Sequence, residues 1–556
     1  MDWPWERIEP FFADLADRQI YEINLSTWLK DWTRVNELID ESLQRLQVAT
    51  TLDTTDTAAE QKYLAYLENI IPRARAAGQK LKEKLLSCGM RPNSFAIPIR
   101  NMKAEAEIFR EANLPLFTEE RRLANEYDRI IGAQTVQWEG KEITITQLRP
   151  VYQEIDRAKR EAAWRLSAER QLADRAAING VWVKLMKLRG EIAANAGYED
   201  YRDYRWKQLL RFDYNPSDCE TFAHAIADVV VPAAAMLYEK RRRQLGVETL
   251  RPWDLDVDPF ARPPLRPFGE VAELEEKTAA IFRRLDPELG QYFQTMRDEK
   301  LLDLENRKGK APGGYCTTFA VAGRPFVFMN AVGLHDDVQT LLHESGHSFH
   351  VFAADHLPYE QQKEVPMEFA EVASMAMELL AAPQLEALEG GFYTREDAAR
   401  ARLEHLQNSL MFWPYMAVVD MFQHWVYTHH REASDPARCD AKWTELWWRF
   451  MPNVDYRGFE EVMATGWHRK LHIHRYPFYY IEYGLAQLGA VQVWRRSLKN
   501  HAQALADYRR ALALGGTVSL PELFAAAGAK FSFEVNTLQG AVALMMETIK
   551  TLETIQ

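Results

Sequence analysis

The chain has 556 residues, of which 47% are hydrophobic and 27% are charged, and its formal net charge is −12. This length and composition are typical of a globular protein whose core is divided between two or three lobes. The acidic balance argues against nucleic acid and against an anionic membrane surface as partners.

The cysteines and the apolar runs bear on the cellular compartment. The four cysteines lie far apart and form no Cys-x-x-Cys pair, which is typical of free thiols in a reducing compartment. The first residues show neither the basic start nor the apolar segment of a signal peptide. The longest apolar run, at residues 229–237, is interrupted by Pro232 and is too short to span a bilayer. We therefore expect a cytoplasmic protein without membrane contact.

The N-terminal part of the chain is dominated by apolar positions at helical spacing. Residues 1 to about 130 alternate apolar and charged positions, as in Leu81 and Leu85, which predicts a series of amphipathic helices. Residues 135–145 alternate instead with a period of two about a Glu-Gly pair, which predicts a β-hairpin.

Helical spacing returns after this hairpin. It covers residues 148–210 and, beyond a proline-rich connection, residues 270–297. The fold is therefore predicted to be mainly α-helical. We place an N-terminal helical lobe at residues 1–200 and a lobe that carries the chemistry at residues 201–556.

A second short β region follows. Residues 308–319 form a glycine-rich lead into a strand, and residues 325–330 form another strand. The order Gly-Lys-Ser/Thr of a phosphate-binding loop is missing. The glycines either make a plain hairpin turn or let a substrate backbone approach, with the strand edge pairing with an extended peptide. On the second interpretation Gly314 and Tyr315 contact the substrate.

The strongest local pattern is His343-Glu344-Ser345-Gly346-His347. Two histidines four apart leave the same face of a helix, and this spacing suits two ligands of a zinc ion. Glu344 can then act as general base toward a water molecule at the metal. The alternative is a surface helix with two solvated histidines, which the apolar neighbours of the pattern disfavour.

The third ligand must come from elsewhere in the chain. One zincin type needs a glycine at position 350 and a histidine at position 353, but this chain has His350 and Ala353 there. The other type uses a glutamate from a later helix. Glu368, Glu371 and Glu378 share one face of such a helix, amid Phe, Val, Ala and Met side chains.

A later stretch is dense in histidine and tyrosine. Tyr476, Tyr480 and Tyr483 share one face if a helix begins at residue 476 or 477, and His472 and His474 precede them. An aromatic core stripe is one interpretation. We favour a site, because three hydroxyls need partners in a core and because peptide hydrolysis needs donors to the developing oxyanion.

These patterns together resemble the thimet oligopeptidase and oligoendopeptidase F family of zinc peptidases. The resemblance is most specific at residues 343–347, 369–374 and 467–483, and it covers most of the chain from about residue 110. It implies two helical lobes around a long substrate channel, with a small sheet beside the zinc helix. It also selects Glu371 as the third ligand, with Ser374 as a hydrogen-bonding partner.

The resemblance implies the roles of the site residues as well. His343, His347 and Glu371 would hold one Zn²⁺ per chain. The catalytic candidates are Glu344, Tyr483, Tyr476 and His472. His472 best fits the family's offset to the tyrosines, and His474 is the alternative imidazole. The candidates for substrate contact are Tyr480, Gly314, Tyr315 and His474.

The predicted function is zinc-dependent endopeptidase action on short peptides, by a monomer or a dimer. A dipeptidyl carboxypeptidase would use the same core and would need a cation for the substrate carboxylate, for which Arg469, Lys470 or Arg475 could serve. A non-catalytic peptide-binding protein is disfavoured, because Glu344 and all the ligands are present. A structural zinc site would need a fourth protein ligand.

Overall fold

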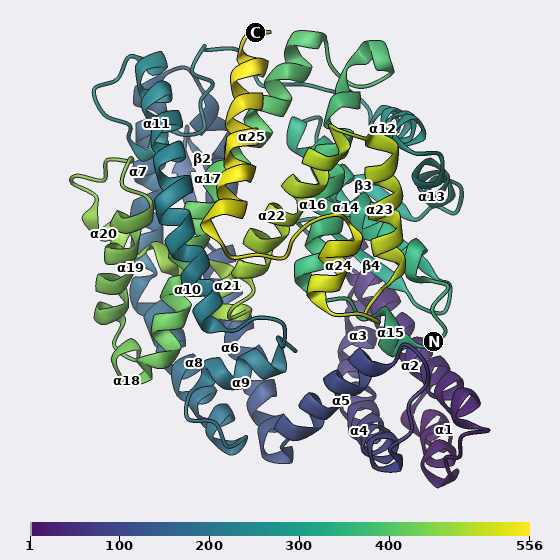
Figure 1. Ribbon diagram of the computed structural model, residues 1–556. Helices are drawn as coiled ribbons and strands as arrows, with labels where there is room; N and C mark the ends of the chain where they lie inside the picture. The colour runs from purple at the N-terminus through teal and green to yellow at the C-terminus, as the bar shows by residue number, and fades with distance from the viewer. Residues whose placement is uncertain (1–2, 556) are drawn as a thin grey trace.

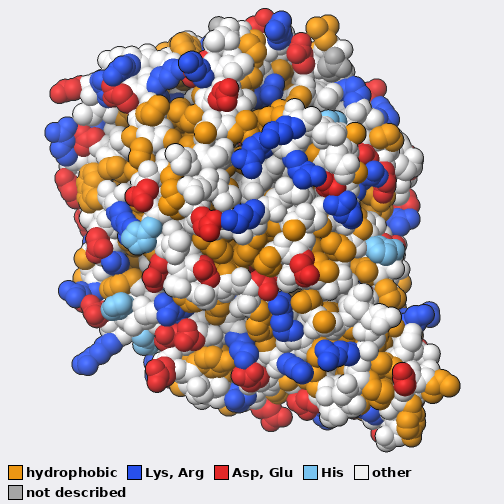
Figure 2. All heavy atoms as spheres, viewed as in Figure 1, with side chains coloured by type: hydrophobic (Ala, Val, Ile, Leu, Met, Phe, Trp, Pro, Cys, Tyr) orange, Lys and Arg blue, Asp and Glu red, His pale blue; other side chains and the backbone are white. Residues whose placement is uncertain are grey.

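The computed structural model describes residues 3–555 and consists mainly of α-helices, which confirms the predicted fold class (Figure 1). The first helices gather at one corner of the molecule, away from the C-terminal helix. Acidic and basic side chains are interspersed over the face in Figure 2.

Six helices form the N-terminal region. Asp56 caps the third of them, because its carboxylate accepts hydrogen bonds from the backbone N–H groups of Ala58 and Ala59. Trp28 and Trp32 on the second helix face a small hydrophobic core of their own. The helices are α1 (Trp5–Asp17), α2 (Leu25–Leu52), α3 (Thr57–Asn69), α4 (Ile71–Cys88), α5 (Ala96–Ile108) and α6 (Leu114–Gly132).

The predicted hairpin is confirmed. Strand β1 (Thr135–Trp138) pairs antiparallel with β2 (Lys141–Thr144). Glu139 and Gly140 between them have φ angles of 49° and 79°. Two successive positive φ angles are what a two-residue primed turn requires, which explains the glycine.

The predicted helices after the hairpin are present as well. Within the eighth helix, Trp182 donates a hydrogen bond to the carbonyl of Ala433, and Arg189 donates one to the carbonyl of His474. The large core therefore continues across residue 200, and the lobe boundary there stays a prediction. The helices are α7 (Arg157–Ala173), α8 (Arg175–Asn195), α9 (Tyr201–Gln208), α10 (Pro216–Ala225), α11 (Val231–Leu245), α12 (Val271–Leu285) and α13 (Pro287–Asp298).

One helical stretch, Pro216–Leu245, is long and apolar enough to cross a membrane by length and composition alone. It joins α10 and α11 through the π-helical segment Ile226–Val230, and half of its apolar window is buried. Phe222 is fully buried, and the stretch packs against helices of the C-terminal half. Core helices pass the same test, so the stretch is weak evidence for a membrane span.

The second β region is a three-stranded sheet. Strands β4 (Tyr315–Phe319) and β5 (Arg324–Ala331) are antiparallel and confirm the two predicted strands. The order is β3-β5-β4, and β3 (Leu302–Glu305), which the sequence analysis did not predict, is parallel to β5. Helix α14 (His335–Ala354) packs on β5 and β4, so the sheet lies beside the helix that carries the His-Glu-x-x-His pattern (Figure 1).

Three helices cross closely at the centre: α14, α16 (Met367–Ala381) and α22 (Tyr480–Ser497). Gly346 makes the first crossing possible, because a Cβ there would lie 2.5 Å from the Cα of Ser374. Gly489 acts similarly between α22 and α16, where a Cβ would lie 2.8 Å from a methyl carbon of Val372. Small residues at both crossings let the backbones approach one another.

The other helices of the C-terminal half surround this centre. Among the described residues the remaining helices are α15 (Glu360–Lys363), α17 (Arg395–Thr428), α18 (His430–Ala433), α19 (Pro436–Phe450), α20 (Glu460–Ala464), α21 (Leu471–Arg475), α23 (His501–Ala513), α24 (Leu520–Ala526) and α25 (Val535–Glu553). Short 3₁₀ segments lie at Glu111–Asn113, Ile145–Gln153, Pro252–Asp254, Ala382–Leu385, Ala387–Glu389 and Gly466–Arg469.

Candidate metal centre and active site

The structure brings the three predicted metal ligands together. His343 and His347 project from one face of α14, and Glu371 projects from α16. Oε2 of Glu371 lies 3.4 Å from Nε2 of His343 and 3.8 Å from Nε2 of His347. Ligands of one tetrahedral zinc ion are about 3.3 Å apart, which follows from bond lengths of about 2.0–2.1 Å. The three donors therefore converge at a spacing that suits one ion.

Further side chains hold these donors in place. Nδ1 of His343 lies 2.6 Å from Oε1 of Glu378, which directs Nε2 of the imidazole toward the other donors. The hydroxyl of Ser374 donates a hydrogen bond of 3.2 Å to Oε2 of Glu371. Burial lowers the pKa of His343, but hydrogen bonds to Glu371 and Glu378 outweigh burial and raise it well above its usual value. The carboxylates thus create a negative field that favours a bound cation.

Glu344 lies beside this centre and is largely buried. The pKa of its carboxyl is raised to about 7, chiefly by burial; the charge of His343 opposes this rise, and the charges of Glu371 and Glu378 support it. The backbone N–H of Cys316, on the neighbouring strand β4, hydrogen-bonds the carboxylate. A carboxyl with such a pKa can both accept and release a proton near neutral pH.

The tyrosine segment differs in part from its prediction. The helix expected from residue 476 begins instead at Tyr480, and Tyr476 lies outside it with 43% of its surface exposed. Phe478 has a φ angle of 66°, which interrupts the helix directly after Pro477. Its backbone N–H donates to Gln423, and its carbonyl accepts a hydrogen bond of 2.5 Å from Arg211. Tertiary contacts stabilise this turn, and the predicted common face of the three tyrosines is wrong.

This turn directs Tyr479, which was not among the predicted site residues, toward the candidate metal ligands. The hydroxyl of Tyr479 donates a hydrogen bond of 3.2 Å to Oε1 of Glu371. Tyr483 lies one turn further, with the two ring centroids 5.2 Å apart. A helical period begun at residue 479 rather than 476 would have identified the pair.

The imidazole of His472 lies among these tyrosines. Its ring centroid is 5.7 Å from that of Tyr479, 5.0 Å from that of Tyr480 and 5.9 Å from that of Tyr483. Tyr476 is somewhat more distant, at 6.4 Å. The structure therefore places His472 next to the candidate metal centre.

His474 lies elsewhere. Its side chain is fully buried and stacks on Tyr127 and Trp467, at ring-centroid distances of 4.2 Å and 5.8 Å. This position contradicts the predicted contact with substrate and the alternative role as active-site imidazole. The helix α21 directs alternate histidines to different sides, so only His472 faces the tyrosines.

Two other residues predicted to contact the substrate, Tyr480 and Tyr315, form contacts with side chains of the protein itself. Tyr480 is 5% exposed and accepts a hydrogen bond of 2.6 Å from Lys470. Tyr315 stacks on Phe328, and its hydroxyl lies 2.6 Å from that of Thr51 on α2. Gly314 directly precedes edge strand β4, where a Cβ would lie 3.4 Å from a backbone carbonyl.

A second set of possible metal donors lies in the core. Cys219, Asp420 and His424 are fully buried, and a carboxylate oxygen of Asp420 lies 3.4 Å from Nε2 of His424. This is an ion-pair distance within one helix. Since no part of the set is exposed, it cannot receive a peptide and is not the candidate centre.

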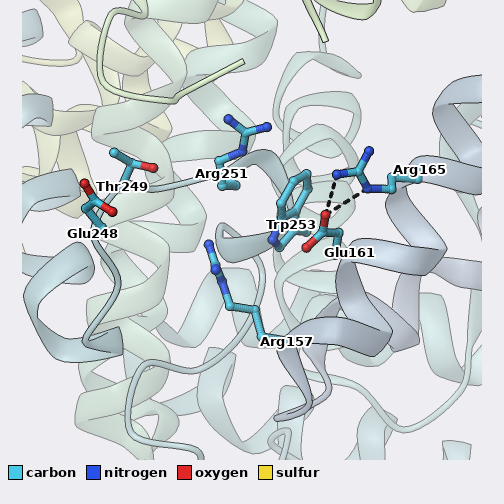
Figure 3. A pocket seen from close by; sticks show the side chains of 7 residues that line it. All are labelled: Arg157, Glu161, Arg165, Glu248, Thr249, Arg251 and Trp253. Atoms are coloured by element: carbon cyan, nitrogen blue, oxygen red, sulfur yellow. Dashed lines mark hydrogen bonds and ion pairs between the residues drawn. The ribbon is translucent and has the colours of Figure 1, made fainter. Parts of the chain in front are cut away.

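A surface cavity lies apart from the candidate centre. It measures about 290 Å³ and lies between α7 and the loop near residue 250 (Figure 3). Arg165 and Glu161 form an ion pair on its wall. None of the predicted site residues lines it. Its lining residues are Arg157, Glu161, Arg165, Glu248, Thr249, Arg251 and Trp253.

Two histidines and one glutamate form a candidate metal-donor set within a mainly helical fold. Residues 151–541 match the family model described as "Peptidase family M3", and the chain therefore belongs to this family of metallopeptidases. The predicted resemblance is thereby confirmed.

Individual relatives agree with this assignment. A stretch of 112 residues is 32% identical to the chromosomal oligoendopeptidase F of Lactococcus lactis subsp. cremoris, and it covers 20% of this chain and only 18% of that protein. The structure of PZ peptidase A with inhibitor 2 has a TM-score of 0.91 and 27% identity, over 100% of this chain and 99% of the other.

A putative oligoendopeptidase F has a TM-score of 0.89 and 26% identity, over 98% and 96% of the two chains. A further putative oligoendopeptidase F, from Bacillus anthracis str. Ames, has a TM-score of 0.86 over 100% and 98% of the two chains. It is 23% identical, so it shows the shared fold alone.

Proposed function

We propose that this chain is a zinc-dependent endopeptidase that hydrolyses internal bonds of short, unstructured peptides. One observation supports the proposal above all others: two imidazoles of α14 and the carboxylate of Glu371 converge within 4.8 Å, beside Glu344. The cluster around His472 borders the same point through Tyr479. Family membership and the printed names of the relatives agree with action on peptides.

The donor set fits zinc. His343, His347 and Glu371 would hold the ion, and imidazole nitrogen together with carboxylate oxygen is a combination typical of catalytic zinc sites. Three protein ligands leave one coordination position open, in contrast to a structural site. When bound, the ion supplies a Lewis acid that makes water more acidic and polarises a carbonyl group.

Glu344 acts as the proton carrier in this proposal. Its carboxylate accepts a proton from the attacking water, and its carboxyl then donates that proton to the leaving amine. Burial is the main cause that raises the pKa of this carboxyl to about 7, so it can both accept and release a proton near neutral pH. Replacement by glutamine would leave the shape of the centre intact and remove the base.

Tyr483 and His472 stabilise the oxyanion that forms when water adds to the carbonyl. The hydroxyl of Tyr479 is engaged by Glu371, so Tyr483 is the better placed donor toward a substrate. Burial raises the pKa of Tyr483 well above its usual value, which keeps the phenol protonated as a donor. Tyr476 lies at the exposed side of the same cluster and is available to an extended peptide.

The test is mass spectrometry of the products from a short peptide that is acetylated at one end and amidated at the other. We expect internal cleavage, and we expect a zinc chelator to abolish it. Cleavage that begins only when the C-terminal carboxylate is freed would favour a dipeptidyl carboxypeptidase. Cleavage that persists after removal of all metal would contradict the proposal.

A further inference from the structure

Two adjacent cations in front of the tyrosine cluster have no acidic partner. Arg469 and Lys470 are both partly buried, and neither forms an ion pair with any residue of the described range 3–555. The chain carries 80 acidic residues against 68 basic ones. A partly buried cation without a carboxylate partner loses part of its hydration and has no ionic contact to replace it.

Lys470 contacts aromatic rings instead of carboxylates. The ammonium nitrogen of Lys470 donates to the hydroxyl of Tyr480 and lies 4.0 Å from that ring's centroid and 5.4 Å from the ring centroid of Tyr415. Arg469 donates a hydrogen bond of 3.3 Å to the carbonyl of Val462. Burial lowers the pKa of Lys470 to about 8. An anion that enters beside these groups would offset their desolvation.

Lys470 also lies next to the candidate active site. The ring of Tyr480, which contacts Lys470, has its centroid 5.0 Å from that of His472 and 5.8 Å from that of Tyr483. His472 experiences the charges of both Lys470 and Glu371. A peptide held at the metal centre would therefore pass close to the ammonium group.

Two other cations of this region are paired with carboxylates. Arg475 forms an ion pair with Asp128, although it lies only five residues along the chain from Lys470. Arg211 forms an ion pair of 2.6 Å with Glu482. Arg469 and Lys470 differ from these two cations, because neither has a carboxylate partner among residues 3–555.

We propose that Lys470, with Arg469 beside it, binds a carboxylate of the peptide substrate at a fixed distance from the scissile bond. The carboxylate belongs either to the free C-terminus or to an aspartate or glutamate side chain. The proposal rests on the proposed function and adds a determinant of specificity to it. Of the three cations considered for a carboxypeptidase, Arg469, Lys470 and Arg475, the one that faces the site is Lys470.

The test is a binding experiment on the full chain carrying Glu344→Gln, so that peptides bind without being cleaved. Three series of zinc-loaded titrations by calorimetry use a short neutral amide, the same peptide with a free C-terminus, and amides with glutamate in place of glutamine at each position in turn. We expect one carboxylate source to bind at least about tenfold more tightly than the neutral amide, as a charge-assisted hydrogen bond provides. The source that gains affinity identifies the ligand.

Substitutions then assign the effect to the residue. Lys470→Met should reduce the affinity ratio of carboxylate to neutral peptide to about one. Lys470→Glu should invert it in favour of a lysine-bearing peptide. Arg475→Gln, the matched control in the same segment, should retain the full ratio. Each ratio is measured within one protein variant, so partial loss of folded protein does not alter it.

Two results would overturn the inference: a ratio near one in the Glu344→Gln background, or an unchanged ratio after Lys470→Met. Failure of the proposed function is recognised separately, because the otherwise unchanged chain would then fail to cleave any peptide. If the neutral amide is bound and cleaved without a preference for carboxylates, the inference fails while the proposed function stands.

Discussion

At the scale of single residues, the candidate centre has ligands and residues that position them. Glu371 is both a proposed ligand and the acceptor of hydrogen bonds from Ser374 and Tyr479. Glu378 orients the imidazole of His343 through its contact of 2.6 Å with Nδ1. The two glutamates should therefore differ in how strongly their loss affects metal binding.

We expect Glu371→Ala to lose zinc at concentrations that saturate the unsubstituted chain. Glu378→Gln should retain zinc with an affinity lower by about 10–100-fold, the effect typical of a partner behind a ligand. Metal content after equilibrium dialysis, measured by mass spectrometry, separates the two. Full occupancy in Glu371→Ala would contradict the ligand assignment, and the buried Cys219–Asp420–His424 set would then have to be considered.

The two tyrosines of the turn should also differ. Tyr483→Phe removes the proposed oxyanion donor and should lower kcat by a factor of about 10²–10³ with little change in KM. Tyr479→Phe removes a hydrogen bond to Glu371 and should act mainly on zinc affinity. Tyr292→Phe is a control, because its hydroxyl bonds Glu288 at the surface. Equal kcat in Tyr483→Phe and the control would refute the donor role.

At the scale of elements, the centre depends on how closely α14 and α16 approach. Gly346 lies within the His-Glu-x-x-His pattern and faces the backbone of α16 at Ser374. The sequence alone does not explain this glycine, since glycine weakens a helix by about 1 kcal/mol relative to alanine. The close crossing of α14 and α16 explains the glycine. A Cβ at position 346 would lie 2.5 Å from the Cα of Ser374 and would keep the two helices, and hence the metal donors they carry, apart.

Gly346→Ala should therefore separate the two helices. We expect a loss of about 1–3 kcal/mol in the free energy of unfolding, the usual cost of overpacking, together with weaker zinc binding. Gly180→Ala is the matched control on helix α8, because nothing lies within 4 Å of its Cβ position. Urea denaturation of both variants measures the difference. Equal stability of the two would show that the crossing can relax without cost.

The sequence predicted these elements unequally. The His343–His347 pattern and the Glu371 helix could be recognised because their spacing is local and set by helical periodicity. The turn at Phe478 could not, since its left-handed conformation depends on Gln423 and Arg211, which are distant in sequence. For the same reason Tyr479 was missed and the helix start was placed too early.

Strand β3 shows the same limit. It has four residues and pairs in parallel with β5, so its hydrogen-bonding partner lies about 25 residues further along the chain. A run of this length carries little periodic pattern. The sheet's other two strands were predicted because each is longer and is bounded by glycine or proline.

At the scale of the whole molecule, a series of hydrogen bonds joins the N-terminal helices to the rest of the described chain. The hydroxyls of Thr51 and Tyr315 meet between α2 and β4, and the backbone N–H of Thr54 donates to the carbonyl of Gly309. Helix α15 packs on α2 and α5 from the other side. Within this contact, one carboxylate oxygen of Glu360 is buried without a hydrogen-bond partner.

This carboxyl predicts a dependence of stability on pH. Burial raises the pKa of Glu360 from 4.5 to about 8 in the folded chain. The folded state then binds more protons than the unfolded state between these values, so this group lowers the free energy of unfolding as pH rises from about 4.5 to about 8. Glu360→Gln should remove that loss and raise Tm at pH 8 relative to the unsubstituted chain, with a smaller difference at pH 5.

Glu68→Gln on the exposed face of α3 is the control, and it should leave the pH dependence of Tm unchanged. Thermal unfolding followed by circular dichroism at both pH values provides the comparison. If Glu360→Gln and the control show the same pH dependence, Glu360 is ionised without cost and the contact is more hydrated than its burial indicates.

The most direct test of the whole account is turnover by Glu344→Gln, with zinc content measured in the same samples and a doubly blocked peptide as substrate. We expect one zinc ion per chain in both proteins, because Glu344 is not among the converging donors. We expect cleavage to fall by at least about 10³-fold, because the proton carrier is lost. Cleavage at a comparable rate with full zinc occupancy would contradict the proposed mechanism.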